Sequence, residues 1–151
     1  MRKRLIAIIG AGACNESIRG IAREMGRKVA ESGAILVCGG LGGVMEAAAM
    51  GAKESGGLTV GILPGFTMDD SNPYIDVPIV TGLSHARNVI VVRSSDIIVA
   101  IAGGYGTLSE IALALKMGKS VIGINTWESV EGVIQVKNPE EAMEKIKELT
   151  K

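Results

Sequence analysis

The chain has 151 residues, of which 47% are hydrophobic, 21 are glycine and only 3% are aromatic. That length suits one domain with a full hydrophobic core. Sixteen basic residues balance sixteen acidic ones, so no strong field draws the protein to nucleic acid or to an anionic membrane, and no apolar run approaches the ~20 residues of a membrane helix. We therefore expect a single cytoplasmic domain, residues 1–151, that binds a small molecule.

Residues that usually hold metal ions are scarce. Cys14, Cys38 and His85 are the only cysteines and the only histidine, and their spacing matches no usual zinc motif. We predict no metal site, and two free thiols in a reducing compartment. Basic residues 2–4 before an apolar stretch imitate an export signal, but residues 5–9 are too few for its apolar region.

The first half of the chain alternates short apolar runs with helical patterns. We predict strands over residues 5–9, 34–38 and 58–63. The first helix is capped by Asn15 or Ser17, and the second, built of small residues, covers 44–55. This alternation of strands and helices is typical of a parallel sheet with right-handed crossovers.

The second half repeats the alternation after a less regular segment. Residues 66–78 form a long loop, for which a lid over a ligand and a plain surface connection both remain open. Thr107 and Glu110 have capping-box spacing, which predicts a helix beginning at Thr107. The other predicted elements are strands near Ile79 and Val80 and over 97–101, 121–124 and 134–136, and helices over 89–94 and from Asn138 onward. We predict an α/β fold, a Rossmann-like doubly wound, mainly parallel sheet of about six or seven strands with helices on both faces.

Three glycine turns follow the first, second and fifth predicted strands. The carboxyl ends of parallel strands share one edge of the sheet, so we expect these turns to meet there. Glycines let the backbone approach an anion closely, and the free N–H groups at a helix start favour phosphate. The predicted phosphate- or nucleotide-binding residues are Gly10, Gly12, Gly39, Gly40, Gly42, Gly43, Gly103, Gly104, Tyr105, Gly106 and Thr107.

Two cofactor chemistries fit these turns poorly. Residues 10–12 begin like the GxGxxG dinucleotide fingerprint, but Asn15 stands at the third glycine and no acidic residue follows the second strand. No lysine lies in a glycine turn, where pyridoxal phosphate would form its Schiff base. Neither a nicotinamide nor a flavin nor a pyridoxal enzyme is therefore expected.

The most specific signal is the string GGYGTLSE at residues 103–110. It resembles the PGGxGTxxE signature of the LOG family, the lysine decarboxylase-like proteins whose characterised members are phosphoribohydrolases of cytokinin nucleotides. The wider group also holds molybdenum-cofactor carrier proteins. Residues 38–46 look like the family's GGGxxGLMG region, and residues 85–88, HARN, fall where the phosphoribohydrolases carry an HxRK-type motif.

The resemblance implies roles for individual residues. Arg87 matches the family's ligand-binding and catalytic arginine, Glu110 its catalytic glutamate, and residues 103–107 its phosphate loop. It also implies a homodimer or a higher homo-oligomer. Without the resemblance, Glu110 is interpreted as a capping residue and Arg87 as a surface cation. The apolar residues 89–92 fit either a subunit interface or a helix buried within its own subunit.

Three departures separate the sequence from the phosphoribohydrolases and make it look closer to the carrier branch. Ala102 replaces a proline, Ser109 replaces a glutamate and Asn88 replaces a lysine. Two hypotheses stay open. In one, Glu110 and Arg87 hydrolyse a nucleoside 5′-monophosphate to free base and ribose 5-phosphate. In the other, the protein is a carrier or sensor that holds a nucleotide or molybdopterin unchanged. Neither involves lysine decarboxylation or a cofactor besides that ligand.

Overall fold

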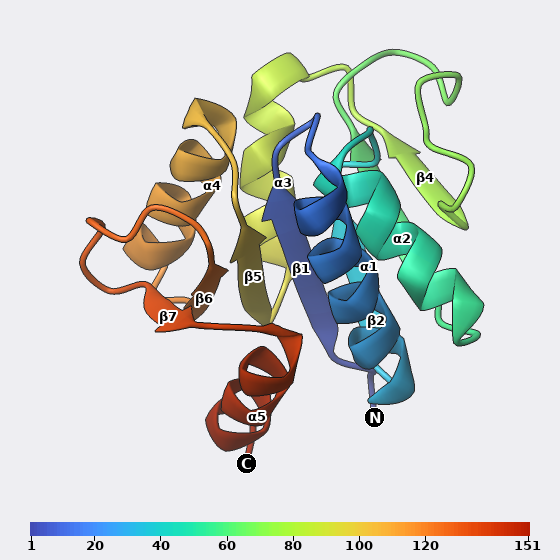
Figure 1. The fold of residues 1–151 in the computed structure, drawn as a ribbon. Helices are drawn as coiled ribbons and strands as arrows, with labels where there is room; N and C mark the ends of the chain where they lie inside the picture. The colour runs from blue at the N-terminus through green and yellow to red at the C-terminus, as the bar shows by residue number, and fades with distance from the viewer.

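The computed structural model describes residues 1–151 as one seven-stranded sheet flanked by five helices (Figure 1). All strand pairs are parallel, in the order β4-β3-β2-β1-β5-β6-β7. The strands are β1 (Leu5–Gly10), β2 (Ile35–Cys38), β3 (Thr59–Leu63), β4 (Val77–Val80), β5 (Ile97–Ile101), β6 (Val121–Ile124) and β7 (Ile134–Val136). The helices are α1 (Glu16–Glu31), α2 (Val44–Glu54), α3 (Arg87–Ser94), α4 (Tyr105–Lys116) and α5 (Pro139–Leu149), with a 3₁₀ turn, η1 (Ser84–Ala86), before α3. The predicted fold class is confirmed.

The sheet is buried on both faces. Along β1, Ile6 and Ile8 pack with α1, α2 and α5, whereas Ala7 and Ile9 pack with α3 and α4. Successive side chains of a strand point to opposite faces, so a strand covered on both sides is apolar at every position. This is the physical reason for the continuous apolar runs in the sequence. Figure 1 shows the two helical layers.

The direction of winding reverses between β1 and β5. β1 pairs with β2 on one side and with β5 on the other, with Gly10 opposite Ile101 at the carboxyl end. In open parallel sheets, a crevice forms at this point because the loops after the two strands lead to opposite faces. The first and third predicted glycine turns therefore lie next to each other.

Caps fix the ends of two helices as the sequence predicts. The Asn15 side chain accepts a hydrogen bond of 2.9 Å from the Ile18 N–H, so Asn15 rather than Ser17 caps α1. Asn138 caps α5 in the same way, by accepting from the Glu141 N–H at 2.9 Å.

Two predicted boundaries around the long loop differ from the structure. β4 begins at Val77 and includes Pro78, which the prediction placed in the loop. Proline is tolerated there because β4 is an edge strand and needs no outward N–H. Helix α3 begins at Arg87, two residues earlier than predicted, because η1 leads directly into it.

The end of that loop is attached to the second glycine turn. Asn72 is 7% exposed, its backbone N–H donates to the Gly40 carbonyl at 2.9 Å, and its side chain donates to the Leu41 carbonyl at 2.8 Å. Phe66 and Met68, at the other end of the loop, remain exposed. The loop is therefore anchored on the side next to the turns.

None of the helices combines the length and apolarity needed to cross a bilayer.

Helices α1 and α2 meet through two glycines. A Cβ atom on Gly26 would lie 1.9 Å from the Ala48 carbonyl oxygen, and one on Gly51 would lie 1.9 Å from the Arg23 carbonyl oxygen. Backbone atoms of one helix therefore occupy the space where the other would carry a side chain. This close contact keeps α2 and the turn before it against the sheet.

We expect Gly51→Ala to lower the free energy of unfolding by about 1 to 3 kcal/mol, because the new methyl group pushes the two backbones apart. The matched control is Gly20→Ala on the exposed face of α1, where nothing lies within 4 Å. That change should raise the free energy of unfolding by about 0.5 to 1 kcal/mol through helix propensity. Urea denaturation measures both, and similar effects of the two substitutions would contradict the packing argument.

Candidate functional site

Helix α4 presents free backbone donors at the carboxyl edge of the sheet. It begins at Tyr105, with Gly104 as N-cap and no side-chain capping bond. Its first internal hydrogen bond runs from the Leu108 N–H to the Gly104 carbonyl, 3.0 Å. The N–H groups of Gly104, Tyr105, Gly106 and Thr107 therefore have no partner within the helix. Such a helix start attracts anions.

The prediction that Thr107 caps this helix is wrong. Thr107 lies inside the first turn and is 3% exposed, and Glu110 makes no capping bond. The reason is steric: the Thr107 side chain fills the space beside Gly103, where a Cβ atom would come within 2.2 Å of the Thr107 hydroxyl. Gly103 has φ +101°, a backbone conformation that glycine allows.

The backbone also explains one departure from the LOG signature. Ala102 has φ +50°, a value that the ring of proline excludes. Its carbonyl accepts a hydrogen bond of 2.5 Å from the Thr126 hydroxyl, which ties the turn to the loop after β6. Proline at this position is therefore incompatible with the path of the turn in this protein.

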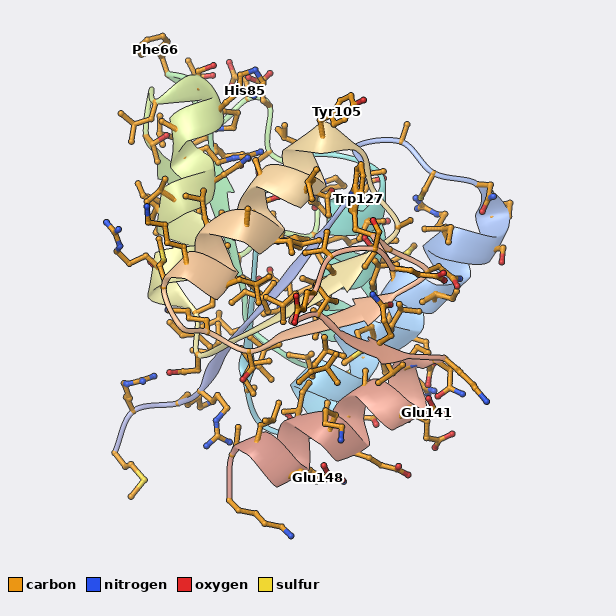
Figure 2. All side chains as sticks on the ribbon, turned by 90° about the vertical axis from the view of Figure 1, so that its left-hand side faces the viewer. Phe66, His85, Tyr105, Trp127, Glu141 and Glu148 are labelled. Carbon is orange, nitrogen blue, oxygen red and sulfur yellow. The ribbon has the colours of Figure 1, made fainter.

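A cavity of about 400 Å³ opens at the point where the winding reverses. Its walls come from the loops after β1, β2, β3 and β5 and from the start of α3. The lining residues are Gly10, Ala11, Gly12, Leu41, Met45, Pro64, Ser84, His85, Arg87, Asn88, Gly104, Gly106, Thr107 and Glu110. Figure 2 shows His85 and Tyr105 at the same end of the molecule, opposite α5.

Arg87 is a buried cation on the wall of this cavity. It is 9% exposed, its Nη1 donates to the Asn88 side-chain oxygen, and its Nη2 lies 3.5 Å from the Gly39 carbonyl. Its Nε has no partner at all. Burial lowers the pKa of the guanidinium, while Glu110 and Cys38 act in the opposite direction. A buried guanidinium with an unused donor is costly unless an anion or acceptor approaches it.

Glu110 is a buried carboxyl that lines the same cavity. It lines the cavity from α4, is 7% exposed and has no hydrogen-bond partner in the protein. Burial raises its pKa from 4.5 to about 7, and Arg87 only partly opposes that rise. A carboxyl with a pKa near neutrality can exchange a proton at physiological pH.

The comparisons with known proteins agree with this architecture. A family model described as the SLOG cluster4 family matches residues 3–150. The chain belongs to the SLOG cluster4 family. An uncharacterized protein of Archaeoglobus fulgidus is 50% identical over 143 residues, covering 95% of this chain and 94% of that relative. A cytokinin riboside 5′-monophosphate phosphoribohydrolase of Mycobacterium tuberculosis is 32% identical over 123 residues, which span 75% of this chain and 65% of that enzyme.

Two solved structures are similar over nearly the whole SLOG chain. The molybdenum cofactor binding protein of Rippkaea orientalis has a TM-score of 0.95 at 39% identity, with 100% of this chain and 99% of that one covered. The molybdenum cofactor carrier protein of Chlamydomonas reinhardtii has a TM-score of 0.90 at 37% identity, with 98% of each chain covered. The predicted resemblance to the LOG-like group, including its carrier branch, is confirmed.

The structure brings most of the predicted site residues of this SLOG chain together, some as lining of the cavity and one as a neighbour of Arg87. Arg87, Glu110 and Thr107 line the cavity with the glycines Gly10, Gly12, Gly104 and Gly106. Gly39 borders Arg87, because a Cβ atom there would lie 2.7 Å from Nη2. Gly40, Gly42, Gly43, Gly103 and Tyr105 do not line it. Gly43, for example, packs against the turn after β1: a Cβ atom added to it would lie 2.3 Å from the Ala11 carbonyl oxygen.

Other lining residues escaped the sequence prediction. His85 opens the HARN region and Ser84 directly precedes it, but the prediction assigned a role to Arg87 alone. Ser84 has φ +54°, which no sequence pattern indicates. Leu41, Met45 and Pro64 are apolar and gave no signal. Cys38 lies beneath the site, and burial raises the pKa of its thiol to about 11, so it is not a ready nucleophile.

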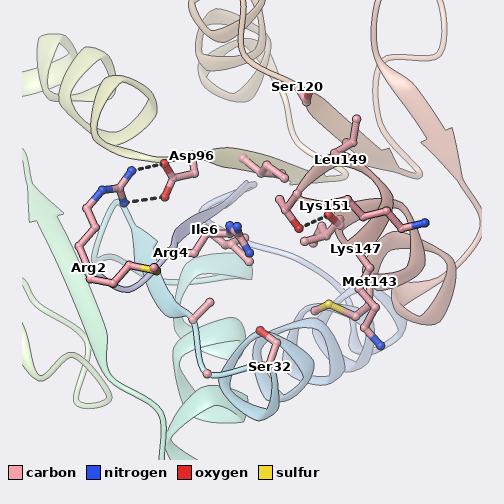
Figure 3. Close-up of a pocket in the computed structure, with 16 residues that line it drawn as sticks. Arg2, Arg4, Ile6, Ser32, Asp96, Ser120, Met143, Lys147, Leu149 and Lys151 are labelled. Carbon is pink, nitrogen blue, oxygen red and sulfur yellow. Dashed lines mark hydrogen bonds and ion pairs between the residues drawn. The ribbon is translucent and has the colours of Figure 1, made fainter.

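A larger hollow of about 930 Å³ lies at the opposite edge of the sheet (Figure 3). Its cations are on the surface, and Arg2 is already paired with Asp96 at 2.7 Å. That pairing holds the pKa of Asp96 down to about 2. This larger hollow has neither a glycine turn following a strand nor a buried unpartnered group.

No three His, Cys, Asp or Glu side chains gather to hold a metal ion anywhere in the protein.

We expect the stability of the ligand-free protein to fall as the pH rises from about 4.5 to about 7. In this range the folded state keeps the Glu110 proton that the unfolded chain releases, because the pKa of Glu110 is raised to about 7 in the fold. Relative to Glu110→Gln, the wild type should lose up to about 3 kcal/mol of unfolding free energy across the range, with no further loss above it.

Urea denaturation of the two proteins at several pH values measures this difference. Glu144→Gln, at an exposed position on α5, is the matched control and should follow the wild type at every pH. Parallel pH profiles for wild type and Glu110→Gln would show that the carboxyl is solvated rather than buried.

Proposed function

We propose that the protein binds a phosphorylated nucleotide-like or pterin-like molecule in the cavity between β1 and β5. The observation that carries this proposal is that unsatisfied backbone donors and a buried, incompletely bonded cation border one cavity. The N–H groups at the start of α4 have no partner in the helix, and the Arg87 Nε has no partner in the protein. A phosphate bound there would accept from the N–H groups and would neutralise the buried cation.

Glu110 adds a second requirement for the ligand. A simple anion would be repelled by a carboxylate on the same cavity wall, unless the carboxyl is protonated. A ligand that combines a phosphate with hydroxyl or amino groups meets both requirements, because those groups donate to Glu110 while the phosphate meets the start of α4 and Arg87. Sugar phosphates, nucleotides and phosphorylated pterins have this composition.

We propose binding without turnover as the main activity. The two similar solved proteins, whose descriptions name molybdenum cofactor binding and a molybdenum cofactor carrier, correspond to this chain over nearly its full length. The chain also has Asn88 where the phosphoribohydrolase motif has lysine, and Asn88 is engaged with Arg87 and lies 3.5 Å from the Ser109 hydroxyl. The ligand class that these points favour is a phosphorylated pterin.

Hydrolysis of a nucleoside 5′-monophosphate is the second candidate, and Glu110 favours it. Cleavage of an N-glycosidic bond builds positive charge on the ribose, which a fixed carboxylate stabilises while it orients the attacking water. Glu110 faces the cavity without another partner and has a pKa of about 7. The products would be the free base and ribose 5-phosphate.

A homo-oligomer also remains a proposal, on the strength of the family resemblance. Helix α3 buries Val91 and Val92 within its own subunit. Of the apolar residues of this helix, only Val89 and Ile90, which are half-buried, are left for contact with a second copy.

We expect Arg87→Gln to weaken binding of phosphorylated ligands about tenfold to a hundredfold, the usual loss for one charge-assisted hydrogen-bonding group. Isothermal titration with inorganic phosphate, AMP and a pterin phosphate ester measures the effect. Arg93→Gln, on the exposed side of the same helix, is the control and should bind like the wild type. Equal affinities of the two variants would remove Arg87 from the site.

Turnover separates the two candidate functions. Purified protein is incubated with nucleoside 5′-monophosphates, and free base is measured by chromatography. The binding function predicts saturable binding with no base released. If the hydrolase operates, Glu110→Gln should lower release at least about a hundredfold, because it removes a group acting in acid–base catalysis, while Glu144→Gln should leave release unchanged. Release that survives Glu110→Gln would exclude the proposed catalytic role.

A further inference from the structure

Two of the few aromatic residues in the chain meet beside the candidate phosphate site. The protein has one tryptophan, two tyrosines and one phenylalanine. Tyr105 begins α4 and Trp127 lies in the loop after β6, yet their ring centroids are 6.1 Å apart with the planes inclined by 31°. Figure 2 shows the two side chains near the start of α4.

The pair is attached to the backbone that forms the phosphate site. Tyr105 is the first residue of α4 and lies between Gly104 and Gly106, both of which line the cavity. The Trp127 indole N–H donates to the Gly104 carbonyl at 3.2 Å. The rings are thus held at a fixed place relative to the free N–H groups, outside the cavity itself.

The cavity has no comparable surface for a flat ring. No phenylalanine, tyrosine or tryptophan lines it, and most of its walls are glycine or polar side chains. The Tyr105 side chain, in contrast, is 84% exposed. Aromatic rings stack on purines and related heterocycles, and rings already fixed in place lose little entropy when they do so.

We propose that Tyr105 and Trp127 form a stacking platform for the heterocyclic ring of the ligand whose phosphate binds at the start of α4. This inference rests on the proposed binding function and adds the place of the ring. The ring lies over the platform at the cavity mouth, and the phosphate, one sugar or side-chain length away, faces the N–H groups and Arg87. Selection for a planar heterocycle then comes from residues that are separate from the phosphate site.

The test compares ligands with and without a ring. Ribose 5-phosphate, AMP, GMP and a phosphate ester of 6-hydroxymethylpterin are titrated against wild type, Tyr105→Ala and Phe66→Ala. Phe66 is the matched control, because it is equally exposed but lies on the loop after β3. For wild type we expect at least one ring compound to bind about tenfold or more tighter than ribose 5-phosphate, and to quench the fluorescence of the single tryptophan.

Tyr105→Ala should abolish most of that advantage and leave the affinity for ribose 5-phosphate unchanged, whereas Phe66→Ala should preserve both. Trp127→Phe, which keeps a ring but loses the N–H donor, should retain part of the preference. Three outcomes would show that the platform is wrong while the binding function stands, provided that the phosphates bind. The tighter binding of ring compounds could survive Tyr105→Ala, it could disappear in Phe66→Ala, or it could be absent in wild type. If none of the phosphates binds, the proposed function fails together with the platform.

Discussion

The pairing of β1 with β5 is the contact on which the candidate site depends. It places the turn after β1 beside the turn after β5 and sends their helices to opposite faces of the sheet. The crevice between the turns is therefore a consequence of topology. Side chains do not close it, because Gly10, Gly12, Gly104 and Gly106 carry none.

Electrostatics within the crevice are unusual for a chain with zero formal net charge. One cation and one carboxyl are both more than nine-tenths buried, yet neither uses its full hydrogen-bonding capacity inside the protein. Buried polar groups in folded proteins nearly always find partners. The exceptions here share one cavity with a helix start, so they are better explained as ligand contacts than as contributions to stability.

The same geometry serves a carrier and a hydrolase up to the last chemical step. In both proposals the phosphate meets α4 and Arg87, and they differ only in whether Glu110 acts on a glycosidic bond or accepts hydrogen bonds from an unchanged ligand. Placement of the ligand ring decides between these roles, because it sets which bond faces Glu110. A platform at Tyr105 and Trp127 would draw the ring toward the mouth, which suits a protein that must later release an intact ligand.

The sequence by itself determined the alternation of buried strands with helices, the helix start at Asn138, the three glycine turns and the family signature around residues 103–110, and it narrowed the cap of the first helix to Asn15 or Ser17. These features depend on local periodicity and on neighbouring residues, which a single chain displays directly. Only the tertiary structure decided that α4 starts at Gly104 rather than Thr107, because that start depends on the packing of the Thr107 side chain beside Gly103. The tertiary structure also decided which glycines line the cavity and which pack between turns. It buries Glu110 enough to raise its pKa, and it places Trp127 against Tyr105. Each of these depends on segments that are distant in the sequence and meet only when the sheet is assembled.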